Sequence, residues 1–249
     1  MKVLVIGAGG REHALAWRLS RSPRVKSIVS CPGNAGLTQL GPCWSGVSPD
    51  ADPAQLLQHI RRERVDLVVI GPEAPLVAGL GDFLREAGVP TFGPSRAASR
   101  LEGSKAHAKR FMKRHGIPTA PFQIVQQSTE LAGALKQFPG PAVVKADGLA
   151  AGKGVILTAN TQEADQAARS MLDGGRFGNA GRTVVLEERL EGIEVTMLVF
   201  VSGRDYALLE SAQDYKPLEA GNKGPNTGGM GAYSPTRLLS QGLRQRMVQ

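Results

Sequence analysis

Residues 143–155 read VVKADGLAAGKGV, an apolar run that ends in a lysine and continues into a glycine-rich loop with a second lysine. Val143 and Val144 favour a buried strand, and Lys145 at its end is costly to bury unless an anion meets it. Three glycines let the backbone pass close to a ligand with its N–H groups exposed; they are Gly148, Gly152 and Gly154. With Lys153 as a mobile positive charge, the stretch is typical of a phosphate cradle.

The loop is not a Walker phosphate loop. Three residues instead of four separate Gly148 from Gly152, and Gly154 follows Lys153 where a Ser or Thr would hold magnesium. By itself, the loop is equally compatible with a β-turn that carries a solvated lysine. The neighbouring segments therefore decide between these two interpretations.

The composition limits the class of protein. The chain has 249 residues, which suits roughly one to two domains. Thirty Lys and Arg against 22 Asp and Glu give a net charge of +8, but this charge is scattered and only 7 Phe, 2 Trp and 3 Tyr are available to stack on bases. We therefore expect anionic small molecules as ligands and no nucleic acid. The basic runs at 61–64 and 105–114 favour solvated helix faces.

The two cysteines, Cys31 and Cys43, form no CxxC pair, and no histidine cluster has zinc spacing, which favours thiols in a reducing compartment. The chain runs from MKVLVIG directly into a strand without a signal pattern, and no apolar run reaches the ~18 residues of a membrane helix. We expect a cytoplasmic protein without a membrane partner.

The N-terminal segment predicts a strand at 2–6, a glycine turn GAGGREH at 7–13 and then a helix. Such a turn presents backbone N–H groups and a helix N-terminus to an anion, so we expect a phosphate or a nucleotide there. A dinucleotide fits less well, because Glu12 stands where the third glycine of GxGxxG would fall and the strand at 25–30 ends without an acid for a ribose. The alternative is a tight turn with Arg11 and Glu12 in water.

Strands and helices then alternate along the chain. Leu56, Leu57 and Ile60 mark a helix, and the apolar runs at 66–70 and 89–92 predict strands. The loops after the predicted strands carry glycine or proline; they lie at 32–36, 71–76 and 93–95. The alternation predicts an open parallel, Rossmann-like sheet in an N-terminal α/β domain at 1–102, with ligands at the carboxyl ends of its strands.

A helix and linker at 103–121 lead into a second unit, because IPTAP breaks the helix. Strands and helices are predicted at 122–125, 128–138, 142–145, 155–157, 161–172 and 183–186. They form a compact α+β module at 122–190 that can close over a nucleotide as a lid. Lys105 begins the preceding helix, where a cation is disfavoured unless a phosphate shares the place; the alternative is a lysine that points into solvent.

The module's last strand continues into EERLEGIE at 187–194. Acceptors at a strand end beside a lysine-bearing strand suit the adenine amino group at Glu187 and the ribose hydroxyls at Glu194. The alternative is an acidic hairpin turn in solvent.

Taken together, these segments resemble the ATP-grasp fold and, within it, the phosphoribosylamine–glycine ligase family. The matching segments follow the family's order nearly end to end. Besides 143–155 and 187–194 they are VLVIGAGGREHALAW at 3–17, PGNAG at 32–36, VIGPEAPLV at 69–77, FGPS at 92–95, LEGSKA at 101–106, IPTA at 117–120 and GPNTGGMGAYSP at 224–235. The resemblance implies a pre-ATP-grasp N-terminal domain, an ATP-grasp lid and, at 191–249, the start of the ATP-grasp core.

The resemblance implies an ATP-dependent ligase of purine biosynthesis. Such an enzyme joins glycine to 5-phosphoribosylamine through a glycyl phosphate and releases glycinamide ribonucleotide, ADP and phosphate. It implies ATP contacts at Lys105, Lys145, Gly148, Gly152, Lys153, Gly154, Glu187, Leu190 and Glu194. It implies substrate contacts at Gly9, Gly10, Arg11, Glu12, Gly33, Asn34, Glu73, Asn226, Thr227 and Gly228. It implies catalytic roles for Lys145, Lys153, Asp214 and Lys216.

The chain departs from the family pattern at two places. The family commonly has a basic residue after QDHK, whereas this chain has QDYKP at 213–217. It contains no Glu-x-Asn, so we expect the ligands for Mg²⁺ or Mn²⁺ beyond residue 249 and no ligase activity from these residues alone. Two further interpretations stay open: a partial chain that binds a ligand or partner without turnover, and a dinucleotide-dependent oxidoreductase.

Overall fold

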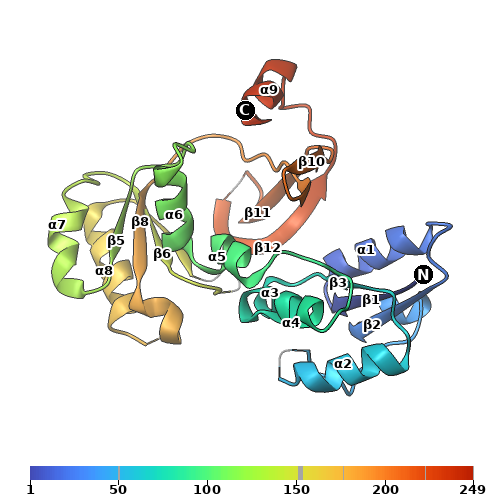
Figure 1. Ribbon diagram of the computed structural model, residues 1–249. Helices are drawn as coiled ribbons and strands as arrows, with labels where there is room; N and C mark the ends of the chain where they lie inside the picture. The colour runs from blue at the N-terminus through green and yellow to red at the C-terminus, as the bar shows by residue number, and fades with distance from the viewer. Residues whose placement is uncertain (50, 151–153, 176, 222, 249) are drawn as a thin grey trace.

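Two α/β bodies lie on either side of two antiparallel strand pairs (Figure 1). The computed structural model describes residues 1–49, 51–150, 154–175, 177–221 and 223–248. The first body, coloured blue to green, and the second, coloured green to orange, each contain a sheet of their own. The predicted α/β class with an N-terminal parallel sheet is confirmed.

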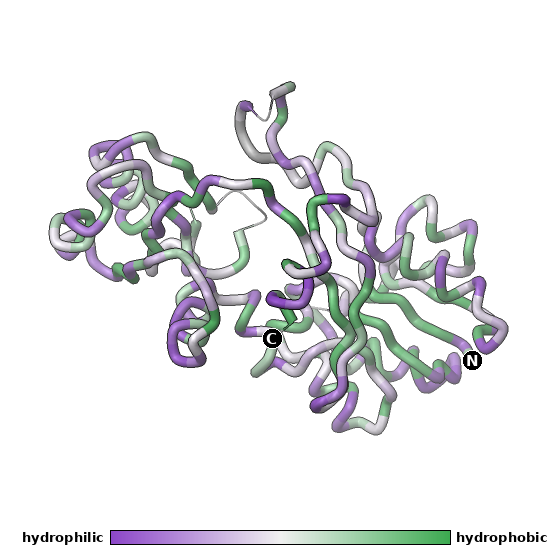
Figure 2. The backbone as a smooth tube through the Cα atoms, turned by 90° about the horizontal axis from the view of Figure 1, so that it is seen from above, coloured by the Kyte–Doolittle hydropathy of each residue, from purple (hydrophilic) through white to green (hydrophobic). Residues whose placement is uncertain are grey.

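The first body is a four-stranded parallel sheet with the strand order β2-β1-β3-β4. Its strands are β1 (Lys2–Gly7), β2 (Ser27–Pro32), β3 (Leu67–Ile70) and β4 (Thr91–Phe92). Alternate residues of β1 enter different apolar clusters, since Val3 and Val5 lie on one face and Leu4 and Ile6 on the other. Both faces of the sheet are therefore buried, and its apolar strands appear as green segments inside the body (Figure 2).

Helices cover both faces of this sheet. They are α1 (Gly10–Ser20), α2 (Pro53–Arg62), α3 (Glu73–Ala78), α4 (Leu80–Glu86) and α5 (Arg96–Gly103), with a 3₁₀ turn η1 (Leu37–Gln39). Ala16 of α1 packs in the same cluster as Val3, whereas Leu56 of α2 and Leu84 of α4 pack in the cluster of Leu4. The carboxyl edge of the sheet is thus the part left for a ligand.

The sequence prediction of a loop at 71–76 was wrong, because α3 begins inside it. Glu73 is the first helical residue and Pro72 precedes it in an extended conformation. Pro75 lies in the first turn, where a backbone N–H has no partner within the helix and its absence costs little. A proline-rich stretch that looks like a loop can therefore start a helix.

The second body is an antiparallel sheet with the strand order β5-β8-β6-β7. Its strands are β5 (Phe122–Val125), β6 (Ala142–Ala146), β7 (Val155–Thr158) and β8 (Val184–Glu188). Its helical segments are η2 (Ser128–Glu130), α7 (Leu131–Leu135), α8 (Thr161–Leu172) and η3 (Gly178–Arg182), and α6 (Lys105–Arg114) precedes it. The helix predicted at 128–138 is a 3₁₀ turn followed by a short helix.

The two faces of this sheet differ in chemistry. Val144 of β6 and Leu186 of β8 belong to the apolar cluster that includes residues of α7 and α8. Lys145 and Glu187 are the next residues along their strands, so their side chains emerge on the opposite face. One face is the core of the body, and the other holds charged groups beside α6.

The remaining strands form two antiparallel pairs. They are β9 (Val199–Ser202) with β10 (Asp205–Leu208), and β11 (Gln213–Glu219) with β12 (Lys223–Tyr233), and α9 (Gln241–Val248) follows. The first pair contacts the N-terminal sheet, since the rings of Phe92 and Phe200 meet edge to face with centroids 5.7 Å apart. In the part of the chain that the structure describes, no helix has the length and apolar character needed to cross a bilayer.

Candidate functional site

The glycine turn before α1 encloses a buried carboxylate. Glu12 is only 3% exposed, and its Oε2 accepts a hydrogen bond of 2.7 Å from the backbone N–H of Gly9, the N-cap residue of α1. A methyl group at Gly7 or Gly71 would run into the Glu12 side chain. These glycines therefore make room for the acid, and the predicted alternative with Glu12 in water is wrong.

Arg11 points outward from the same turn. Its Nε donates to Oε1 of Glu12 at 2.9 Å and its NH2 donates to Oε2 of Glu73 at 3.3 Å, while 58% of its side chain stays exposed. The hydrogen bond to Glu12 is the main cause that raises the pKa of the Arg11 guanidinium above its ordinary value. Glu12 therefore fixes the orientation of an accessible, permanently charged anion binder.

The loop after β2 closes over this turn. The Nδ2 of Asn34 donates to the carbonyl oxygen of Ala8 at 2.8 Å, and its Oδ1 accepts from the N–H of Leu37 at 2.9 Å. Gly33 has a φ of +79°, which a residue with a side chain rarely adopts. The structure thus brings together the seven residues predicted for the N-terminal site, at the carboxyl ends of β1, β2 and β3; they are Gly9, Gly10, Arg11, Glu12, Gly33, Asn34 and Glu73.

The second group of predicted residues lies on the charged face of the second sheet. Val143 and Glu187 are paired between β6 and β8, so Lys145 lies diagonally across from Glu187 on the same face. The Nζ of Lys145 is 2.8 Å from Oε2 of Glu187. The sequence predicted that an anion lies beside Lys145. Without a ligand, that anion is the carboxylate of Glu187.

A lysine that the sequence pattern did not single out joins this pair. Lys109 of α6 lies 3.0 Å from the same Oε2 of Glu187 and is only 7% exposed. The solvated helix face predicted for 105–114 is therefore wrong at this position. The i, i+4 spacing from Lys105 was the available signal, because it puts both lysines on one side of the helix.

The start of α6 is joined to the glycine loop. Lys105 is the first residue of the helix, and its Nζ donates to the carbonyl oxygen of Gly148 at 2.8 Å. Burial lowers the pKa of the Lys105 ammonium below its ordinary value. The sequence predicted a phosphate at this helix N-terminus, and in the structure the carboxylate of Asp147 lies there. Its Oδ1 accepts a hydrogen bond of 3.0 Å from the N–H of Ala106, and its Oδ2 accepts one of 3.0 Å from the Ser104 hydroxyl.

The glycine loop is described in part. Gly148 has a φ of +91°, and a methyl group at Gly154 would crowd Ala150 and Ala146. The predicted phosphate contacts Gly152 and Lys153 lie outside the described residues. The described parts fit a phosphate group, because Lys105 and Lys145 both reach the edge of the loop with partly buried ammonium groups.

The catalytic and substrate-binding residues predicted between 214 and 228 form a separate group on β11 and β12. The Nζ of Lys216 lies 2.8 Å from Oε2 of Glu194 and 2.9 Å from Oδ2 of Asp214. These hydrogen bonds, the one to Glu194 first, raise the pKa of Lys216 above its ordinary value. The Oγ1 of Thr227 donates to the carbonyl oxygen of Lys216 at 2.8 Å.

Three further predicted residues lie near this group in the chain. Leu190 is 67% exposed, and Gly228 has open space on its Cα. Asn226 pairs with Pro217 in the β11–β12 ladder, and its side chain lies outside the described part of the structure. Among the described residues, no group of three or more His, Cys, Asp or Glu side chains could hold a metal ion.

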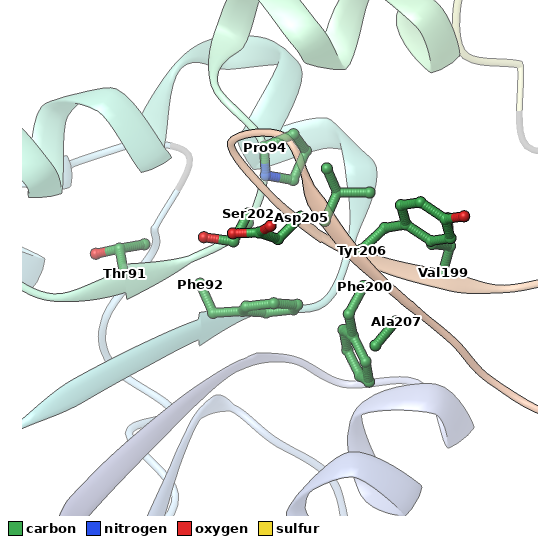
Figure 3. Close-up of a pocket in the computed structure, with 11 residues that line it drawn as sticks. Thr91, Phe92, Pro94, Val199, Phe200, Ser202, Asp205, Tyr206 and Ala207 are labelled. Atoms are coloured by element: carbon green, nitrogen blue, oxygen red, sulfur yellow. The ribbon is translucent and has the colours of Figure 1, made fainter.

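A hollow of about 740 Å³ lies between β4 and the β9–β10 pair (Figure 3). Phe92, Pro94, Phe200 and Tyr206 give it a largely apolar lining, and Asp205 adds one acid. None of the predicted site residues that the structure describes borders it. We therefore place the candidate site at the three charged clusters around Arg11, Lys145 and Lys216 rather than at this hollow.

The comparisons with known families cover the chain from end to end. Residues 1–102 match the family described as phosphoribosylglycinamide synthetase, N domain, and residues 103–249 match its ATP-grasp (A) domain. The phosphoribosylamine–glycine ligase of Allochromatium vinosum is 49% identical over 250 residues, which cover 100% of this chain and 58% of the relative. The ligase of Escherichia coli O6:H1 is 47% identical, with the same shares. The chain thus spans a little over half the length of these relatives.

Solved structures agree with this match. The phosphoribosylamine–glycine ligase of Thermotoga maritima has a TM-score of 0.80 and 35% identity, over 96% of this chain and 56% of that chain. The biotin carboxylase domain of the Hydrogenobacter thermophilus 2-oxoglutarate carboxylase, solved with the magnesium salt of ADP, has a TM-score of 0.75 and 19% identity, over 99% and 55%. The second likeness concerns the fold alone, and with the family match it confirms the predicted ATP-grasp fold.

Proposed function

Because the chain belongs to the phosphoribosylglycinamide synthetase family, we propose that it forms the phosphoribosylamine site and part of the ATP site of a phosphoribosylamine–glycine ligase. The proposed reaction joins glycine to 5-phosphoribosylamine and converts ATP to ADP and phosphate. The glycine carboxylate is first phosphorylated, and the amine of the second substrate then displaces phosphate from the glycyl phosphate. The product is glycinamide ribonucleotide.

One observation carries the nucleotide part of the proposal. Lys105 and Lys145 approach the glycine loop from α6 and from β6, and both are partly buried. Partly buried ammonium groups that converge on one loop from two elements suit a compact, multiply charged anion, and the phosphates of ATP are such an anion. ATP supplies the phosphoryl group, and the residues of this chain bind and orient it.

The sugar phosphate part rests on the N-terminal turn. The N–H of Gly9 is already bonded to Glu12, which leaves the guanidinium of Arg11 and the N-terminus of α1 at Gly10 for a phosphate. Asn34 and Glu73 lie beside them with oxygen atoms suited to sugar hydroxyl and amine groups. The two clusters thus suit different ligands.

The cluster at Lys216 suits the binding of glycine. Lys216 and Asp214 carry opposite charges side by side, which suits a substrate with both an amine and a carboxylate, as glycine has. The lid keeps water from the glycyl phosphate, which water would hydrolyse. Magnesium or manganese accompanies ATP in this proposal, and no described residue is assigned to the ion.

The test is a comparison of three ligands by isothermal titration calorimetry at constant ionic strength. We expect ADP and ribose 5-phosphate each to bind, and each to bind equally well when the other is present. We expect no heat from NAD. Binding of NAD without binding of ADP would contradict the proposal and favour the oxidoreductase alternative.

A further inference from the structure

Two lysines from different elements share one carboxylate oxygen. The Nζ of Lys145 on β6 lies 2.8 Å from Oε2 of Glu187, and the Nζ of Lys109 on α6 lies 3.0 Å from the same atom. Oε1 of Glu187 is buried and has no hydrogen-bond partner among the described residues. Lys109 and Lys145 are thus the direct ion-pair partners of this carboxylate, and Lys105 adds a weaker electrostatic attraction.

Lys109 is held in place on several sides. Only 9% of its side chain is exposed, its Nζ donates to Oγ1 of Thr119 at 2.7 Å, and its ammonium lies 5.7 Å from the centre of the Phe122 ring. Among the residues that the structure describes, Glu187 is the one acid at ion-pair distance from Lys109, and a hydroxyl and an aromatic face occupy its other sides. It is a fixed partner of Glu187.

Lys145 has the opposite character. It is the penultimate residue of β6, near the start of the glycine loop, and 26% of its side chain is exposed. Within the described residues, its one hydrogen-bond partner is Glu187. Lys145 can therefore turn to a ligand at the loop, provided that Glu187 keeps a counter-ion.

We propose that Lys145 exchanges Glu187 for a phosphate group when a nucleotide binds, and that Lys109 is the positioning residue that keeps Glu187 compensated during this exchange. The inference rests on the proposed function, because it assumes a phosphate-bearing ligand at the glycine loop. Leaving a buried carboxylate without a partner is strongly unfavourable, whereas moving one of two partners is not. Lys109 thus removes a penalty from the binding step without contact with the ligand.

The experiment is a mutant cycle on anion affinity. The changes Lys109→Met and Glu187→Gln, alone and combined, are titrated with ADP and with tripolyphosphate by calorimetry at constant ionic strength. We expect Lys109→Met to weaken both ligands by about tenfold when Glu187 is present, and by less than about threefold in the Glu187→Gln background. In that background no charge needs compensation, so Lys145 is free to move.

Two variants serve as controls. Lys113→Met removes a charge from an exposed position of the same helix, so it reports the general electrostatic effect and should leave both affinities unchanged. Thr119→Val removes the hydroxyl bonded to Lys109 and keeps every charge. It should weaken both ligands slightly with Glu187 present and not at all with Glu187→Gln, and it carries the test if Lys109→Met does not fold.

The outcomes separate this inference from the proposed function. Equal losses in both backgrounds would mean that Lys109 acts on the ligand or on the fold in general, and would overturn the inference. No loss in either background would overturn it as well. If tripolyphosphate binds and shows the cycle while ADP does not bind, the inference stands and the ATP-dependent function fails. If neither ligand binds, both fail.

Discussion

The carboxylate of Asp147 lies at the N-terminus of α6, where its Oδ1 accepts a hydrogen bond of 3.0 Å from the backbone N–H of Ala106. The two residues are 41 positions apart in the chain. This contact joins the glycine loop of the second body to the helix that carries Lys105 and Lys109. Asp147 therefore helps to position Lys105 and Lys109. Its described hydrogen bonds go to Ala106 and Ser104 and not to either lysine.

Replacing Asp147 by alanine should destabilise the protein by about 1–2 kcal/mol, the usual cost of losing a side chain that caps a helix N-terminus. Urea unfolding measures this change. Asp165→Ala is the control, because that carboxylate pairs with Arg169 on an exposed face of α8 at 2.7 Å and such pairs contribute about 0.3–0.5 kcal/mol. Equal losses from both changes would show that Asp147 is an ordinary surface acid.

Much of the fold follows from local signals in the sequence. The apolar runs of β1, β3 and β6 and the helical spacing of α2 and α8 predict elements within a few residues of their observed bounds, because a single periodicity dominates each of them. The helix α3 escaped prediction, since Pro72 before it and Pro75 inside it resemble loop signals. Elements with one dominant periodicity are therefore predictable from the sequence, whereas a helix that begins among prolines is not.

Within the candidate site, the residues that position other residues were harder to predict from the sequence than the residues expected to contact a ligand. Arg11 and Lys145 stand at the ends of recognisable patterns, so the sequence indicates them. Glu12 fills space left by glycines and Asp147 contacts a distant segment, and neither relationship has a period in the sequence. The i, i+4 spacing from Lys105 indicates the side of the helix on which Lys109 lies, but not its partner Glu187 on a distant strand. Their roles required the structure.

Replacing Arg11 by alanine should weaken the binding of ribose 5-phosphate by at least about tenfold, because a guanidinium held by Glu12 is the main charge offered to its phosphate. The affinity for ADP should not change. Arg21→Ala is the control, since that guanidinium lies 4.8 Å from the ring of Trp17 on the outside of the body. A parallel loss of ADP binding in the Arg11 variant would assign the N-terminal turn to the nucleotide.

The affinity for tripolyphosphate should begin to fall at a lower pH than it would if Lys105 had the pKa of a solvated lysine. Burial lowers the pKa of Lys105 in the folded protein, whereas a solvated lysine has a pKa of about 10.4. The attraction is complete below the lowered pKa and is lost as the pH rises through it. Calorimetry between about pH 7 and about pH 9.5 checks this, and Lys105→Arg should reduce the decline because arginine keeps its charge there.

The same lowered pKa predicts a change in stability. Between the folded and the unfolded pKa of Lys105, the unfolded chain binds more protons, so the free energy of unfolding rises with pH in that interval. In Lys105→Met this contribution should be absent. Urea unfolding at several pH values measures it; a parent and a variant with the same pH dependence would contradict the burial of this ammonium.

Replacing Gly71 by alanine should destabilise the protein by about 1–3 kcal/mol, because the added methyl group would collide with Oε1 of the buried Glu12. The matched control is Gly133→Ala on α7, where a methyl group meets nothing within 4 Å. This control should be neutral or stabilising by up to about 1 kcal/mol. Thermal and urea unfolding of both variants measure the difference.

The contacts of α6 also bear on how the protein moves. Lys105 is bonded to Gly148, Lys109 to Glu187, and Ala106 to Asp147, so one and a half turns of the helix are fastened to the second body. A rotation of that body would carry α6 with it as part of one rigid unit, and the pivot would lie before Ser104 rather than in the proline-rich segment 117–121. The distances between these lysines would then stay constant during the rotation, and a phosphate bound between them would move together with the second body.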